Sequence, residues 1–322
     1  MSHPNPTSAL DVQFPTGGPP VLAAESTRGM AWDDFRTALR SLVGEHGALL
    51  VRGLGLSGPE DVTDVFRGLA DALMTEREAF AARETYAEGV YSSSAWPATQ
   101  PMCMHHELSY GMQVPGMMMF ACLTAPESGG ATGVADSPSV LEALPPGLVQ
   151  RFEHEGWLLV RSYNDEIGAS WAESFGTDDR AAVEAYCRAN RIEFSWQPDG
   201  GLHTRQRRRA VLPHPRTGQR CWFNQIAFLN DQTMDPDVRD YLLEVYGADG
   251  LPFTTRFGGG DPIPADVVEL LTGTFAQHTR REPWNAGDLL LVDNIRTAHS
   301  REPYEGRREV LVALADPTPA GH

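Results

Sequence analysis

The sequence MHHELSY, residues 104–110, follows a series of short β-like runs and contains three side chains suited to metal binding. On a β-strand, residues two apart point to the same face of the sheet. We therefore expect His105 and Glu107 to project together and His106 to point away. An imidazole nitrogen and a carboxylate oxygen on one face are typical ligands of a divalent transition metal. The stretch predicts a strand that carries half of a metal site.

A second candidate ligand, His299, lies far along the chain in LLLVDNIRTAH, residues 289–299. Two histidines and one carboxylate on one face of an octahedron leave three positions open. Ferrous oxygenases need this arrangement, because a 2-oxoacid takes two positions and O₂ the third. Zinc accepts similar ligands, so the triad alone does not name the metal. A His-x-Glu tripeptide is also common by chance, and a lone histidine is commonly a surface residue.

Arg308 lies nine residues after His299, just past the turn-like segment PYEG, residues 303–306. A hairpin at this turn would bring Arg308 back beside His299. Arginine suits a bidentate grip on a carboxylate, which the distal end of 2-oxoglutarate requires. Arg307 is the alternative, because the strand register decides which of the two faces the interior. Taken alone, either arginine would more simply be a surface residue.

Hydrophobic periodicity predicts helices early and in the middle of the chain, with strands elsewhere. The expected helices cover residues 30–44, the region from 57, and residues 139–154, 178–189, 235–245 and 265–279. Short apolar runs broken by Pro and Gly begin at Val90 and return at the C-terminal end. The fold class is α+β and mainly β: a double-stranded β-helix, or jelly-roll barrel, with N-terminal and inserted helices. We expect a flexible arm over 1–28 and one catalytic domain over 29–322, with helical insertions at about 139–195 and 232–282.

Composition limits the partners. The 322 residues carry a formal net charge of −17, which disfavours nucleic acids and anionic membranes as partners. No window of about 18 apolar residues and no signal-like N-terminus is present. Four cysteines without a C-x-x-C pair predict free thiols in a reducing cytoplasm.

Four ordered blocks resemble the taurine dioxygenase/TfdA family of Fe(II)/2-oxoglutarate-dependent dioxygenases, best its natural-product and amino-acid-modifying branch. The resemblance spans about residues 48–317. The blocks are VYSSSAWPATQPMCMHHELSY from residue 90, PGMMMFACLTAPESGGATGVADSPSVLEAL from 115, HPRTGQRCWFNQIAF from 214 and DNIRTAHSREPYEGRREVLVALADP from 293.

The resemblance implies that His105, Glu107 and His299 bind Fe(II), and that Thr132 and Arg308 hold the distal carboxylate of 2-oxoglutarate. It implies O₂-dependent oxidation of an unactivated C–H bond, with decarboxylation of 2-oxoglutarate to succinate and CO₂. Hydroxylation is the default outcome, and desaturation or cyclisation follow from the same chemistry. The family often has Asp where Glu107 stands. The retained carboxylate argues against the related halogenases.

A small-molecule substrate is expected, an amino acid or an amino-acid-derived intermediate. The expected substrate contacts lie before the first ligand, in the third block and beside the last ligand: Tyr91, Ser93, Ser94, Trp222, Asn224 and Arg296. The arginine-rich stretch HTRQRRR, residues 203–209, with Arg216 and Arg220, forms a basic island in an acidic protein. An acidic carrier protein bearing a tethered aminoacyl group would fit it, although a solvated face or internal ion pairs explain it more simply.

Three other functions remain compatible with the residues. Within the oxygenases, a taurine- or alkylsulfonate-type catabolic enzyme is the nearest alternative. A zinc hydrolase would use the same ligands to activate water, but it has no need for Arg308. A non-catalytic jelly-roll protein would hold a small ligand without turnover.

Overall fold

The computed structural model describes residues 10–78, 80, 83–164 and 166–321. Its largest sheet has nine strands. Eight of them lie in the order β1-β2-β3-β17-β8-β20-β6-β5, and the ninth, β4, pairs with β20. The strands are β1 (Val12–Gln13), β2 (Val21–Ala23), β3 (Ala48–Arg52), β4 (Leu73–Met74), β5 (Thr85–Ala87), β6 (Val90–Ser92), β8 (Gln113–Thr124), β17 (Leu289–Asp293) and β20 (Glu309–Pro319).

A smaller sheet, in the order β10-β18-β7, carries the candidate ligands. Its strands are β7 (Met102–His105), β10 (Thr132–Asp136) and β18 (Thr297–Arg301). All pairs are antiparallel, and the register sets His299 opposite both Val134 and His105. Phe120 of β8 reaches His299 with ring centroids 5.1 Å apart, so the two sheets face each other across the site.

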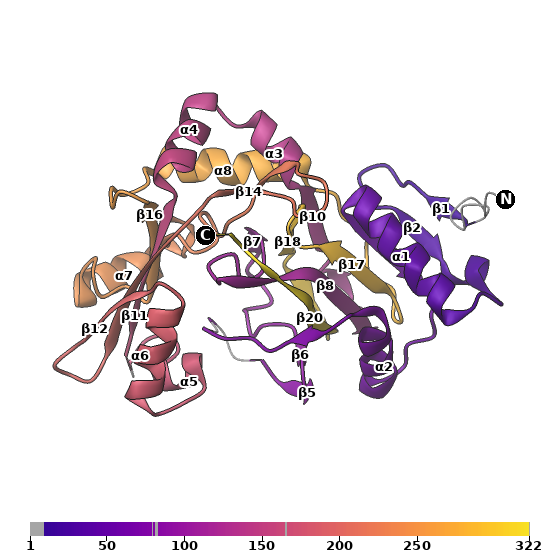
Figure 1. Cartoon of the computed structure of the whole chain (residues 1–322), viewed down its shortest axis with the longest axis horizontal. Helices are drawn as coiled ribbons and strands as arrows, with labels where there is room; N and C mark the ends of the chain where they lie inside the picture. Colours follow the sequence, from indigo (N-terminus) through magenta and orange to yellow (C-terminus); the bar gives the residue numbers. More distant parts are fainter. Residues whose placement is uncertain (1–9, 79, 81–82, 165, 322) are drawn as a thin grey trace.

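The central strands of the large sheet are apolar on both faces, and each face packs against a different layer. On β8, Met118, Phe120 and Cys122 face the smaller sheet. The alternate residues Met117 and Met119 join the core under the N-terminal helices α1 (Trp32–His46) and α2 (Pro59–Leu69). This follows from the two-residue side-chain period of a strand. Figure 1 shows α1 and α2 lying along the large sheet.

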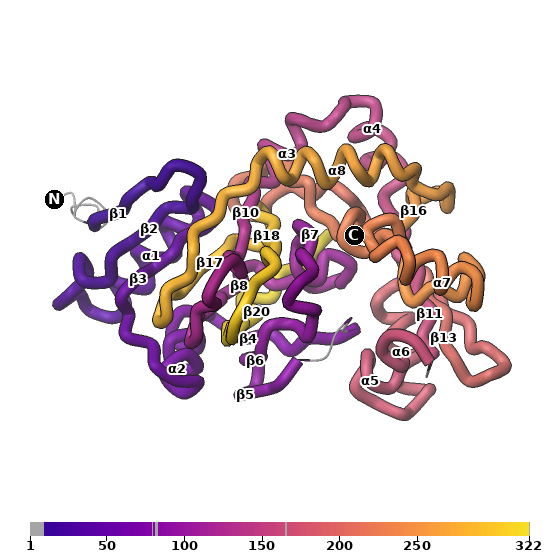
Figure 2. The backbone as a smooth tube through the Cα atoms, turned by 180° about the vertical axis from the view of Figure 1, so that it is seen from behind, coloured from indigo at the N-terminus to yellow at the C-terminus, as the bar shows by residue number. Residues whose placement is uncertain are grey.

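A second lobe is built on the four-stranded sheet β12-β13-β11-β16. Its strands are β11 (Trp157–Tyr163), β12 (Glu193–Trp196), β13 (Leu202–Arg208) and β16 (Phe253–Phe257). Helices surround it and bridge to the main body, as Figures 1 and 2 show. They are α3 (Ser137–Ala143), α4 (Pro146–Glu155), α5 (Trp171–Phe175), α6 (Arg180–Ala189), α7 (Pro236–Tyr246) and α8 (Ala265–His278).

The remaining elements are short. Two-stranded ladders join β14 (Val211–Pro213) to β15 (Arg220–Trp222) and β9 (Ser128–Gly129) to β19 (Tyr304–Glu305). The 3-10 helices are η2 (Ala24–Thr27) and η3 (Asp231–Thr233). Among the described residues, no helix is long and apolar enough to cross a membrane.

The sequence predicted the fold class correctly, as a mainly β jelly-roll with added helices, but several element boundaries differ. The helix expected over 139–154 is two helices, because Pro145 and Pro146 interrupt it between α3 and α4. The region 139–195 is not only helical, since it also contains β11 and β12. The first nine residues of the expected arm lie outside the described residues. From residue 12 the arm instead forms β1, β2 and η2, and β2 pairs in parallel with β3.

Candidate active site

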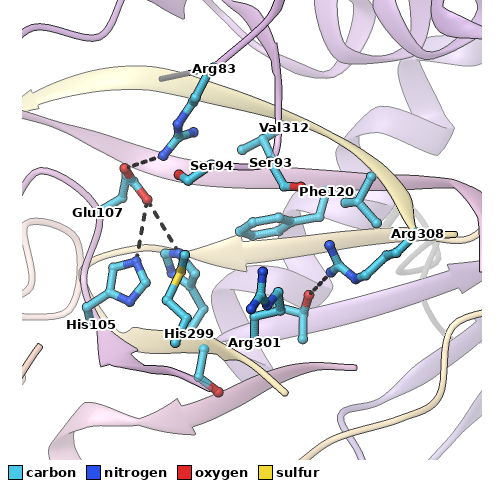
Figure 3. A pocket seen from close by; sticks show the side chains of 14 residues that line it. Arg83, Ser93, Ser94, His105, Glu107, Phe120, His299, Arg301, Arg308 and Val312 are labelled. Atoms are coloured by element: carbon cyan, nitrogen blue, oxygen red, sulfur yellow. Dashed lines mark hydrogen bonds and ion pairs between the residues drawn. The ribbon is translucent and has the colours of Figure 1, made fainter. Parts of the chain in front are cut away.

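The three candidate ligands converge on one point. Their ligand atoms lie within 4.8 Å of one another, and all three residues are buried. His105 ends β7, and the antiparallel register sets it opposite His299. Glu107 follows in the turn, and its Oε2 lies 3.7 Å from His105 Nε2 and 3.4 Å from His299 Nε2 (Figure 3).

Hydrogen bonds fix how two of the ligands point. His105 Nδ1 donates to the Cys103 carbonyl at 2.8 Å, which leaves a lone pair on Nε2 for a metal. The Glu107 backbone N–H donates to Asn294 Oδ1 at 2.8 Å, and Asn294 Nδ2 donates back to the Glu107 carbonyl at 3.0 Å. Arg83 Nη2 donates to Glu107 Oε1 at 3.0 Å. One carboxylate oxygen therefore faces both imidazoles, and the other is held by a guanidinium.

The local electrostatics favour the protonation states that a metal requires. Burial and the nearby His105 together lower the pKa of His299 to about 4, against the opposing effect of Glu107, so His299 is neutral at pH 7. Burial raises the pKa of Glu107, but Arg83 and the two imidazoles outweigh it and hold this pKa well below its usual range. A neutral His299 imidazole beside an ionised Glu107 carboxylate matches the ligand requirements of a divalent cation. The residues present therefore fit an Fe(II) ion.

A cavity opens from the triad along the inside of the large sheet, and we call it the co-substrate cavity. Thr132, Arg301 and Arg308 line the end away from Glu107. Arg308 Nε donates to the Gly130 carbonyl at 2.9 Å, and its Nη2 lies 3.5 Å from Thr132 Oγ1. Burial and the charge of Arg301 lower the pKa of Arg308 to about 10, so it stays charged at pH 7.

The two arginines are held without a carboxylate. Arg301 is buried and donates to the carbonyls of Trp96, Pro97 and Gln100, which fastens the loop before β7 to strand β18. Within the described part of the chain, neither Arg301 nor Arg308 has an acidic partner. Cations held out of water without a counter-charge are costly, so this end of the cavity suits an anion.

Comparison with known proteins agrees with this arrangement. The family model of the taurine catabolism dioxygenases TauD and TfdA matches residues 18–314. The chain belongs to the TauD/TfdA family. It is therefore an Fe(II)- and 2-oxoglutarate-dependent dioxygenase that uses O₂ and acts on a small molecule, and the His-Glu-His triad is its metal-capable site.

Curated relatives that are similar to this dioxygenase include a bacterial and a plant protein. Dapdiamide synthesis protein DdaC from Enterobacter agglomerans is 34% identical over 94% of this chain and 93% of DdaC. A clavaminate synthase-like protein from Arabidopsis thaliana is 28% identical over 86% of this chain and 83% of that protein.

The solved structures share the fold at low sequence identity. PvcB from Pseudomonas aeruginosa, an Fe, alpha-ketoglutarate dependent oxygenase from an isonitrile synthetic pathway, superposes with a TM-score of 0.55 at 16% identity, covering 100% of this chain and 97% of PvcB. A putative taurine dioxygenase from Burkholderia xenovorans gives a TM-score of 0.56 at 15% identity, covering 96% and 91%.

Within the dioxygenase, the arginine register is resolved by position. Arg308 lines the co-substrate cavity, whereas Arg307 is 77% exposed and pairs with Glu309 at 2.7 Å. The turn before them needs Gly306, whose φ of +80° is a conformation that other residues rarely adopt. Arg307 therefore does not reach the co-substrate cavity.

Only two of the six expected substrate contacts, Ser93 and Ser94, line the cavity. Trp222 is fully buried and packs edge-to-face on Phe152, with ring centroids 5.3 Å apart. Asn224 is buried and donates to the Ala210 carbonyl at 3.2 Å. These two residues have packing roles.

The last two expected contacts also lie outside the cavity. Arg296 pairs with Asp136 at 2.9 Å and donates to the carbonyls of Gly44 and Glu45. The Tyr91 hydroxyl accepts from the Glu76 backbone N–H at 3.4 Å. Arg296 joins α1 to the smaller sheet, and Tyr91 packs against the core.

Sequence reasoning missed Arg83, although it contacts a candidate ligand directly. Its side chain is 9% exposed, and its Nε lies 3.2 Å from Glu76 Oε2. Arg83 lies outside the four blocks that carry the resemblance, so no motif marked the residue. His106 was predicted to point away, and it does: its ring contacts the Asn294 carbonyl at 2.5 Å and Ser137 Oγ at 2.7 Å.

Proposed function

We propose that this dioxygenase oxidises an unactivated C–H bond of an amino acid or an amino-acid-derived intermediate of natural-product biosynthesis. The observation that carries the proposal is the meeting of three metal-capable side chains with a cavity that ends in an arginine lacking an acidic partner in the described chain. The substrate class is supported by DdaC, a dapdiamide synthesis protein that aligns over nearly the whole chain.

In this proposal His105, Glu107 and His299 hold Fe(II), which supplies the oxidising power once 2-oxoglutarate and O₂ are bound. Arg308 and Thr132 hold the distal carboxylate of 2-oxoglutarate, because they line the same cavity as the triad. The balance is R–H + 2-oxoglutarate + O₂ → R–OH + succinate + CO₂. Phe120 and Val312 line the same cavity and keep water from its middle. Desaturation or cyclisation of the substrate would use the same residues.

The test has two steps. Anaerobic addition of Fe(II) and 2-oxoglutarate to the metal-free protein should give saturable binding at one site per chain, and a screen of amino acids and their derivatives should then release succinate under O₂. His299→Ala should lose both iron and turnover, because a ligand is removed. Full activity with normal iron content in His299→Ala, or activity with zinc alone, would contradict the proposal.

We further propose an acidic carrier protein as a partner for a tethered aminoacyl substrate. The basic island is only partly available: Arg208 is buried, Arg216 pairs with Asp293, and Arg220 pairs with Glu153. Arg205, Arg207 and Arg209 are exposed, and Arg205 and Arg207 lie on one face of β13.

A third arginine extends this outer face. Leu158 of β11 pairs with Arg207 on one side and with Arg256 of β16 on the other. Arg205 and Arg256 have no ion pair among the described residues, although the register sets Glu193 of β12 opposite Arg205. Guanidinium groups without ion pairs in an acidic protein favour an acidic partner.

Charge reversal tests the carrier. Arg205→Glu with Arg256→Glu should raise KM for a carrier-bound aminoacyl substrate at least tenfold and leave activity on the free amino acid unchanged. Arg28→Glu, an exposed residue near the N-terminal end, serves as control. Unchanged activity of the double variant on the carrier-bound substrate would contradict the carrier proposal.

A cytoplasmic location stays a prediction, which the four free cysteines support.

A further inference from the structure

A second cavity meets the co-substrate cavity at the triad, and we call it the head-group cavity. The two share Arg83, Ser94, Met102, His105 and Glu107. Beyond these, the head-group cavity is lined by acidic, amide and aromatic side chains that reach it from the N-terminal region, the loop after β15 and β16. They are Glu76, Phe80, Trp96, Tyr110, Gln225, Phe228, Leu229 and Phe253.

Several polar groups on this wall lack a partner. Gln225 is 4% exposed, and its Oε1 makes no hydrogen bond among the described residues. The Trp96 indole N–H is also unpaired, but as a donor it cannot bind an ammonium group, so Gln225 Oε1 carries the argument. Buried polar atoms are nearly always hydrogen-bonded, so an unpaired buried acceptor that lines a cavity indicates a missing ligand with donors to offer.

The charges around the cavity give the sign of that ligand. Two carboxylates, Glu76 and Glu107, share one guanidinium, that of Arg83, at 3.2 Å and 3.0 Å. Arg161 lies nearby behind the Phe80 ring, at 3.6 Å from its centroid, and donates to the Glu78 carbonyl. The set holds two carboxylates and one guanidinium, so Arg83 neutralises only one of the two acids, and a cation on the substrate would pair with the other.

The aromatic side chains also suit a cation. Phe228 stacks on the His105 ring with centroids 4.4 Å apart, and Trp96 lies 5.8 Å from Phe228. Phe80 contacts Phe253 and Tyr110 at 5.7 Å and 5.3 Å. Aromatic faces attract ammonium groups, while carboxylate, amide and hydroxyl oxygens accept the three hydrogen bonds that an ammonium group donates.

We propose that the head-group cavity binds the ammonium group of the substrate, with Glu76 and Gln225 Oε1 as acceptors. The inference rests on the oxygenase function proposed above and adds the head-group chemistry. It applies equally to a free amino acid and to a carrier-bound aminoacyl group, because both retain the amine. Glu76 and Gln225 are thus binding residues that set specificity beside the metal.

Binding of simple probes to the anaerobic Fe(II)- and 2-oxoglutarate-loaded protein tests this. The probes are n-alkylammonium ions from propyl to hexyl and the alcohols of the same lengths, compared by calorimetry and saturation-transfer NMR. At least one ammonium ion should bind about tenfold or more tighter than its alcohol, as a charge-assisted hydrogen bond implies. Glu76→Gln and Gln225→Leu should each lose about tenfold or more for that ammonium ion and little for the alcohol.

Controls separate the outcomes. Glu193→Gln, on exposed β12, should bind the probes as the unmodified protein does, and iron content checks that Glu76→Gln keeps its metal centre. Binding of 2-oxoglutarate is measured in the same samples. Alcohols that bind as tightly as ammonium ions, or no ammonium binding at all while 2-oxoglutarate still binds, would overturn the head-group assignment. Failure of 2-oxoglutarate binding in the unmodified protein would refute the oxygenase function and this inference with it.

Discussion

Arg308 lines the end of the co-substrate cavity and contacts Thr132. Replacing Arg308 with Met removes its positive charge from this end. The shape of the side chain is nearly kept, while the charge and the donors are lost. Truncating one partner of a desolvated, hydrogen-bonded charge pair costs about 2–5 kcal/mol, so the Kd for 2-oxoglutarate should rise about 30-fold to a few thousand-fold. Arg308 pairs with no acid among the described residues, so we expect the fold itself to be little affected.

The assay is anaerobic titration of the Fe(II) protein with 2-oxoglutarate, with Arg307→Met as the matched control. Arg307 is exposed and pairs only with Glu309, so its loss should change the Kd less than twofold, within the usual effect of surface substitutions. Arg301→Met, which removes the neighbouring charge and releases the Trp96–Gln100 loop, should have an intermediate effect. A normal Kd in Arg308→Met, or an equal loss in Arg307→Met, would refute the register and the anchor together.

Three further outcomes are expected. Arg83→Met should weaken iron binding about 10- to 100-fold, because Glu107 Oε1 loses its hydrogen-bond donor. Equilibrium dialysis measures the iron affinity, and an unchanged affinity would contradict this role of Arg83. Burial lowers the pKa of His106 to about 3, below its value of about 6.5 in the unfolded chain. The stability that neutral His106 contributes is therefore full above about pH 6.5 and is lost as the pH falls toward 3. His106→Gln should flatten the Tm–pH curve in this range, and an unaltered slope would count against a buried, neutral His106. Trp222→Ala should cost about 3–5 kcal/mol in the free energy of unfolding by leaving a core void, and denaturant titration showing under 1 kcal/mol would argue against its packing role.

Local rules predicted most of what lies along single strands. His105 and Glu107 lie together and His106 points away, as predicted, but β7 ends at His105 and Glu107 lies in the following turn, so the strand expected over residues 104–110 is wrong beyond His105. The two-residue period does give β8 its two apolar faces. The mainly β class follows from such short alternating runs. These features need no knowledge of distant parts of the chain.

The missed features depend on tertiary contacts. Arg83 reaches Glu107 although the two residues are 24 positions apart in the chain. Glu78, in the same region of the sequence, accepts from Gln206 and Tyr186, far along the chain. Trp222 and Asn224 occupy a block that suggested substrate contacts, yet both side chains are buried away from the co-substrate cavity. Aromatic strand residues such as Trp222 usually pack in the core. The head-group cavity joins segments more than 150 residues apart, which no local pattern records.

We expect His105, Glu107 and His299 to hold a single ferrous ion. The most direct measurement is a crystal structure of the anaerobic Fe(II) and 2-oxoglutarate complex, with anomalous diffraction collected at the iron edge. We expect one iron peak per chain, bonded to Nε2 of each histidine and to Oε2 of the glutamate, with the 2-oxoglutarate distal carboxylate on Arg308. An iron peak at another place, or these three side chains without metal in an active enzyme, would contradict the account.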